Sequence, residues 1–179
     1  MICGNQIKEY TFSTTKANWY SFLLAIPFTA LSIYIFTLIW DIEDFHTSRK
    51  LFYHSFIYIF IFGIIVHELL HGLTWLLFLK GNFKSIKFGL NGLTPYCHCK
   101  APLKAKHYKL GGAMPLVVMG ILPLLAGFIF GNGYFLLLGI FFTITAGGDI
   151  ISLLMLRKIN NNQWVFDHPD KLGFYIKTE

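Results

Sequence analysis

The chain has 179 residues and a mass of 20.6 kDa, which is room for one domain or for a small helical membrane bundle. Apolar residues make up 55% of it and charged residues 13%, against ~25% charged residues in typical soluble proteins. This composition excludes a disordered chain, a coiled coil and an ordinary soluble domain, and three cysteines are too few for a disulfide scaffold. The net charge of +6 comes from basic residues that flank apolar segments, so nucleic acid is not needed to explain it.

Four apolar segments are long enough to be membrane-spanning helices. Residues 18–40 carry no charge and would extend about 34 Å as a helix. The other predicted spans are residues 51–79, 113–130 and 133–156, and the last of these contains Asp149 as its single charge. The sequence therefore predicts an all-α polytopic membrane protein, whose entire chain forms a single integral membrane domain.

The basic residues are distributed unequally about these spans. Four spans place both termini and the loop 80–112 on one side of the membrane, and the connections 41–50 and 131–132 on the other. All Lys and Arg residues except Arg49 and Lys50 then fall on the first side. The positive-inside rule predicts a multi-pass protein of the cytoplasmic membrane with both termini in the cytoplasm.

The second predicted span contains a His-Glu-x-x-His motif, at His67, Glu68 and His71. Residues i and i+4 share one face of a helix, so both imidazoles can reach one Zn²⁺. Glu68 is about 100° around the helix from His67, where it can contact a water ligand without binding the metal itself. Chance would produce the motif roughly 0.006 times in this composition. A structural pair of histidines is the alternative, but ionisable groups at hydrocarbon depth are costly and usually functional.

A catalytic zinc site usually needs a third protein ligand, and Asp149 is the only acid in the fourth span. Counted from the basic residues that follow each span, His67, His71 and Asp149 lie about 20, 14 and 12 Å deep. A hydrogen bond between helices is the other role open to Asp149, in which case Glu68 or His98 would have to supply the missing ligand.

Several segments resemble a bacterial family of membrane proteins described as putative zincin peptidases, which are similar to the site-2 protease intramembrane metalloproteases. The segments that carry the resemblance are 67–71, 94–103, 111–115, 146–149 and 167–169. The resemblance implies a site-2-protease-like core, with His67, His71 and Asp149 as zinc ligands and Glu68 as the general base.

The loop 80–112 has a weak hairpin pattern. Its residues alternate up to Asn91-Gly92, and residues 94–99 are the candidate return strand. In site-2 proteases the corresponding segment forms a β structure that guides an unwound substrate; a purely structural loop is the alternative. Cys97 and Cys99 would share one face of such a strand, but two thiols alone do not close a metal site.

These features predict a zinc-dependent intramembrane metallopeptidase that hydrolyses peptide bonds of a membrane-associated protein or peptide. Its expected partners are that substrate and the lipid bilayer, without nucleic acid; the oligomeric state is left open. A non-catalytic membrane protein that uses bound zinc for structure or for peptide binding is the alternative. A metal transporter is disfavoured, because the first and third spans have no continuous polar path.

Overall fold

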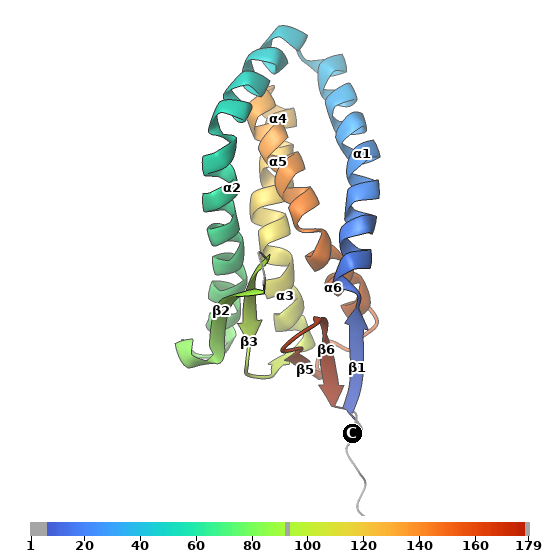
Figure 1. The fold of residues 1–179 in the computed structure, drawn as a ribbon, viewed down its shortest axis with the longest axis vertical. Coiled ribbons are helices and arrows are strands. Elements are labelled where there is room, and N and C mark those ends of the chain that lie inside the picture. Colours follow the sequence, from blue (N-terminus) through green and yellow to red (C-terminus); the bar gives the residue numbers. More distant parts are fainter. Residues whose placement is uncertain (1–6, 92–93, 178–179) are drawn as a thin grey trace, which may run out of the picture. The chain divides into compact units, whose positions relative to one another are not determined.

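The computed structural model describes residues 7–91 and 94–177 (Figure 1). Contacts divide the chain into two compact units. The first consists of Met1–Ala17, Glu68–Met114 and Gly148–Glu179, and the second of Asn18–His67 and Pro115–Gly147. The division falls inside helix α2 (Ile42–Phe78), which contributes to both units.

Three helices of the described chain are long and apolar enough to cross a membrane. They are α1 (Thr14–Ile39), the Phe45–Phe78 part of α2, and a continuous helix made of α3 (Ala105–Pro115), η2 (Leu116–Ile121) and α4 (Leu122–Phe130). Helices α5 (Gly133–Thr145) and α6 (Gly147–Leu156) are long and apolar enough to cross a membrane only when they are taken together, and the pair is bent by 56°. The structure thus indicates a membrane protein with three spans, or four if the bent pair is one span.

The helices differ in detail from the predicted segments. Residues 42–50, expected to connect two spans, form the first turns of α2, and the third long helix begins at Ala105 instead of residue 113. The single helix expected over 133–156 is instead two helices, α5 and α6, which meet at a break at Ala146. Two glycines follow the break, and glycine has a low helix propensity.

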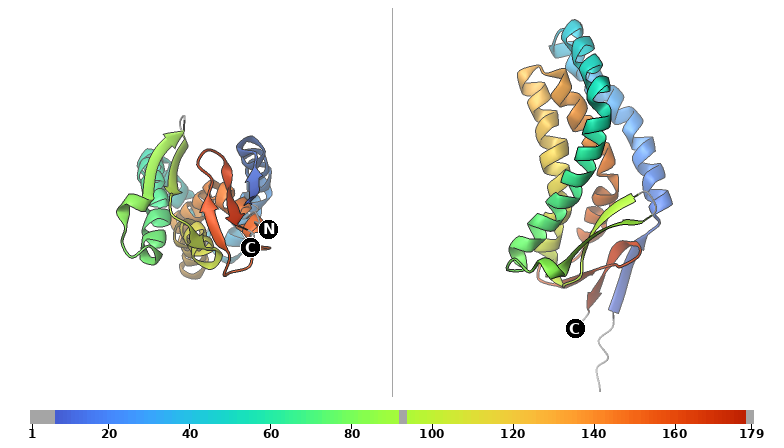
Figure 2. Two further views of the ribbon diagram at one scale, coloured as in Figure 1. Left: turned by 90° about the horizontal axis from the view of Figure 1, so that it is seen from below. Right: turned by 60° about the vertical axis from the view of Figure 1, so that its left-hand side comes forward.

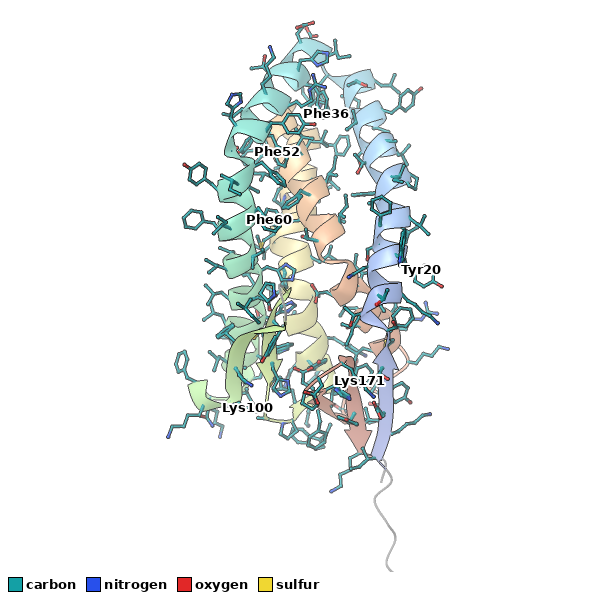
Figure 3. The ribbon with its side chains drawn as sticks, viewed as in Figure 1. Tyr20, Phe36, Phe52, Phe60, Lys100 and Lys171 are labelled. Carbon is teal, nitrogen blue, oxygen red and sulfur yellow. The ribbon has the colours of Figure 1, made fainter. Side chains whose placement is uncertain are left out.

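The second unit is a helical bundle with an aromatic and aliphatic core. Phe36, Phe45, Leu136 and Ile140 are buried together, and Phe36 lies among the helices while Phe60 is 43% exposed (Figure 3). The predicted connection 131–132 is confirmed. Gly131 adopts φ +66° at the end of α4, and the side chain of Asn132 caps α5 by accepting hydrogen bonds from two backbone N–H groups.

The first unit contains two small antiparallel sheets. Strands β2 (Ile86–Asn91) and β3 (Thr94–Cys99) pair in the register Ile86↔Cys99, which confirms the predicted hairpin. It lies beside the C-terminal part of α2 (Figure 2). The second sheet, in the order β1-β6-β5-β4, was not predicted; its strands are β1 (Ile7–Phe12), β6 (Leu172–Lys177), β5 (Trp164–Asp167) and β4 (Leu103–Lys104). The chain is therefore mainly, but not entirely, helical.

The four-stranded sheet joins the two ends of the described chain. Strand β1 pairs with β6 along its whole length, from Ile7↔Lys177 to Phe12↔Leu172 (Figure 1). Beside this pairing, Nζ of Lys171 lies 3.0 Å from Oε1 of Glu9, and this hydrogen bond lowers the pKa of the Glu9 carboxyl.

One hydrophobic core holds the first unit together. It joins the end of α2, the hairpin, α3, the end of α6 and the four-stranded sheet. Its most buried side chains include Cys99, Leu156, Val165 and Phe174. Residues from the beginning, middle and end of the chain are thus packed around the segment that follows His67.

The orientation expected from the basic residues can be tested by cysteine labelling at two exposed positions. Glu43 is at the start of α2 and Lys84 follows its end, so the span between them should place them on opposite sides. In a background with the three native cysteines changed to serine, we expect an impermeant maleimide to label Glu43→Cys in intact cells. Lys84→Cys should be labelled only after permeabilisation. The reverse pattern would overturn the predicted orientation.

Candidate metal centre

The structure brings together the three side chains that the sequence singled out as metal ligands. His67 and His71 are one turn apart on α2, and Asp149 lies on α6. One ligand atom from each lies within 4.8 Å of the others. Nε2 of His71 is 3.3 Å from Oδ1 of Asp149. Glu68 is half-buried on the same helix and does not belong to this group of three.

His71 is held in one orientation by a hydrogen bond from its other ring nitrogen. Its side chain is buried, and Nδ1 lies 2.9 Å from the carbonyl oxygen of Gly111 on α3. A carbonyl can only accept, so Nδ1 carries the proton and donates it. In the neutral ring, Nε2 then keeps its lone pair, and this nitrogen faces Asp149.

An indole ring supports the imidazole of His71. The ring of Trp75 stacks on it with centroids 5.5 Å apart and planes 19° apart. Nε1 of Trp75 donates a hydrogen bond of 3.2 Å to the carbonyl oxygen of Tyr108. A Cβ atom on Gly111 would overlap this indole ring. The residue of α3 whose carbonyl binds His71 must therefore be a glycine.

Asp149 owes its position to the break between α5 and α6. It lies in the first turn of α6, near the positive end of that helix's dipole. Backbone N–H groups in the first turn have no partner within the helix, so a carboxylate is more stable there than in the middle of a continuous helix.

The three side chains fit a zinc ion by donor type and by spacing. Two imidazoles and one carboxylate are a common protein ligand set for catalytic zinc. Two ligands bound tetrahedrally at ~2.1 Å lie about 3.4 Å apart, and the distance from His71 to Asp149 is 3.3 Å. The group therefore has the donor types of a zinc site, and His71 and Asp149 already have the spacing of two zinc ligands.

The hairpin cysteines do not form a second metal-binding group among the described residues. The thiol of Cys99 is buried and donates to the carbonyl oxygen of Ala101 at 3.2 Å. Burial raises its pKa to about 12, and raises the pKa of Cys97 further. Both thiols are therefore protonated near neutral pH, whereas metals bind the thiolate. His98, between them, bonds to Asp167.

The residues that orient the centre were given no role by the sequence. Trp75 and Tyr108 are ordinary aromatic residues in a chain with 18% aromatic content. Gly111 lies in segment 111–115, which carries part of the family resemblance, and a glycine inside a helix often marks a close approach of another segment. Asp167 lies in segment 167–169, which carries part of the family resemblance, but the sequence does not show which residues its carboxylate binds.

Comparison with known proteins identifies a family. A family model with the description "Putative zincin peptidase" matches residues 60–164, a segment that includes His67, Glu68, His71 and Asp149. No curated protein matches the chain, and no solved structure does.

The contact between Gly111 and Trp75 predicts different effects for two neighbouring glycines. Gly111→Ala should destabilise the protein by about 1–3 kcal/mol, the usual cost of forcing an extra methyl into a packed site. Gly112→Ala is the matched control, because its Cβ would meet only a methyl of Leu153 at 3.7 Å. Unfolding in detergent, with and without zinc, measures both. Equal stability of the two variants would contradict the close approach of α3.

Proposed function

The chain belongs to the family of putative zincin peptidases, and on that premise we propose that it is a zinc-dependent intramembrane peptidase. Its substrate would be a membrane-associated protein or peptide. The observation that carries the proposal is the group of two imidazoles and one carboxylate in apolar stretches of α2 and α6. Ionisable groups in such helices are costly and are kept mainly for function.

His67, His71 and Asp149 would hold the zinc ion. When bound, zinc supplies a Lewis acid that polarises the scissile carbonyl and lowers the pKa of a coordinated water toward ~7. The carbonyl of Gly111 keeps the Nδ1 proton of His71 in place, so that Nε2 remains available as a ligand. Trp75 limits rotation of the same ring by stacking on it.

Glu68 would act as the general base. Its carboxylate takes a proton from the attacking water as the oxygen–carbon bond forms at the peptide carbonyl. It then returns that proton to the nitrogen as the carbon–nitrogen bond breaks, so that the amine leaves in neutral form. Glu68 is next to His67 in the sequence but does not belong to the group of three. This position suits a residue that takes a proton from the water and does not coordinate the metal.

The lipid bilayer is the proposed surrounding of the helices. Large apolar side chains project from α1 and α2 with most of their surface exposed; examples are Leu24, Leu38, Tyr53 and Leu77. Exposed apolar surface on this scale is stable in lipid and would cause aggregation in water. We further propose a site-2-protease-like core within the cytoplasmic membrane, with both termini on the cytoplasmic side, as the positions of the basic residues favour.

Replacing Asp149 by Asn tests the third ligand. The amide keeps the size of the side chain but removes the charge that binds the metal. We expect zinc affinity to fall by more than about 100-fold, beyond the ~10–100-fold that loss of an outer partner costs. Competition with a chelator, measured beside His71→Ala, gives the affinity. Wild-type affinity in Asp149→Asn would mean that the residue only bonds one helix to another.

Glu68→Gln separates a peptidase from a protein that merely binds zinc. We expect zinc to be retained and cleavage to be lost, because the amide cannot take the proton. The readout is mass spectrometry of new protein termini in membranes from cells that express either form. Glu43→Gln, an exposed change on the same helix, is the control and should cleave normally. If wild type and Glu68→Gln give the same termini, the non-catalytic alternative holds.

A further inference from the structure

Asp167, the last residue of β5, binds two separate segments through one carboxylate. Its Oδ1 accepts a hydrogen bond from the hydroxyl of Tyr108 on α3, at 2.6 Å. Its Oδ2 accepts from Nδ1 of His98 and from the backbone N–H of Cys99, both at 3.0 Å, on β3. The Asp167 side chain is only 13% exposed, so these bonds are largely protected from water.

The bond to Tyr108 leads to the metal centre by direct contacts. The Tyr108 ring stacks on Trp75, with centroids 5.2 Å apart and planes 11° apart. The Tyr108 carbonyl also holds the indole N–H of Trp75, and Trp75 in turn stacks on His71. Asp167 is thus linked to a proposed zinc ligand through two aromatic rings.

The bonds to His98 and Cys99 lead, through the hairpin, to the residue that follows His71 on α2. The hairpin packs on α2 at Gly72, where a Cβ atom would lie 2.7 Å from the ring of Phe88 and 3.2 Å from Sγ of Cys97. Gly72 directly follows His71. The half-buried thiol of Cys97 therefore reports whether the hairpin is seated on the helix that bears the ligands.

We propose that Asp167 is the positioning residue of the metal centre. Its carboxylate holds Tyr108, and through Trp75 the ring of His71, while it also seats the β2–β3 hairpin on α2. The inference rests on the proposed function, since it takes His71 as a zinc ligand. Asp167 itself is not one of the three proposed ligands, and it acts on His71 through these other residues.

The charge of Asp167 is not required for this role, which gives a distinctive expectation. In Asp167→Asn the amide oxygen can still accept from His98 and Cys99, and the amide N–H can donate to the Tyr108 oxygen. Asp167→Ala removes all three bonds. The alanine variant should bind zinc about tenfold more weakly, as expected for loss of an outer partner, and the asparagine variant should stay close to wild type.

The experiment combines zinc affinity with the alkylation rate of Cys97, read from fragment spectra of the peptide that also carries Cys99. Asp167→Ala should weaken zinc binding and speed alkylation of Cys97 severalfold. Asp170→Ala removes an exposed acid from the same turn and should change neither. If Asp167→Ala matches Asp170→Ala in both measurements, the proposal is overturned. Loss of zinc binding in Asp167→Asn equal to that in Asp167→Ala would also overturn it, in favour of a charge effect.

Two single-contact variants keep the test decisive if Asp167→Ala does not fold. Tyr108→Phe removes one hydroxyl and should weaken zinc binding while Cys97 stays protected. His98→Ala should expose Cys97 and leave zinc affinity near wild type. If both variants change zinc affinity and the alkylation rate of Cys97 in the same way, the proposal that Asp167 holds Tyr108 and the hairpin through separate bonds is contradicted. The alkylation rate of Cys97 measures how the hairpin is seated and requires neither bound zinc nor peptide cleavage. Failure of the wild-type protein to cleave peptides would therefore overturn the proposed function, while the alkylation rates would still test the role of Asp167 in seating the hairpin.

Discussion

Both ring nitrogens of His71 need polar partners, because a buried imidazole without them would be strongly destabilising. Much of the first unit follows from this requirement. The Nδ1 proton needs a backbone carbonyl, which only a close approach of α3 at Gly111 supplies. Nε2 needs an acid or a metal, which requires α6 to begin where Asp149 can face α2. The glycine in α3 and the break before α6 are thus two consequences of one buried histidine.

The three residues of the candidate metal centre could be predicted because their signals are local. The spacing of His67 and His71 fixes their common helical face without reference to the rest of the fold. Asp149 was identified because an ionised carboxylate in an apolar segment is unfavourable in free energy. A lone acid there must be neutral, paired or metal-bound. The hairpin was equally accessible, because alternation and Asn91-Gly92 specify it within a short stretch. Each inference needed only a few neighbouring residues.

The remaining features depend on segments far apart in the chain. Residues 133–156 are long and apolar enough to be taken as one span, so hydropathy did not show the bend that places Asp149 at a helix start. The strands of the second sheet are short, and β1 finds its partner β6 only at the other end of the chain. Tyr108 and Asp167 acquire their importance from a contact between α3 and β5, which no pattern within either segment could show.

The pairing of β1 with β6 also sets the order in which the protein can be completed during synthesis. The segments of the second unit have all been made once Gly147 is added, and an N-terminal part of a chain folds before the rest. The first unit must wait for β6, whose last residue is Lys177. A nascent chain that ends before Gly148 therefore contains the whole of α2 with its two histidines, but neither the carboxylate that faces them nor the partner strand for β1. The carboxylate that completes the candidate site is therefore synthesised after both histidines, in the same unit as β6.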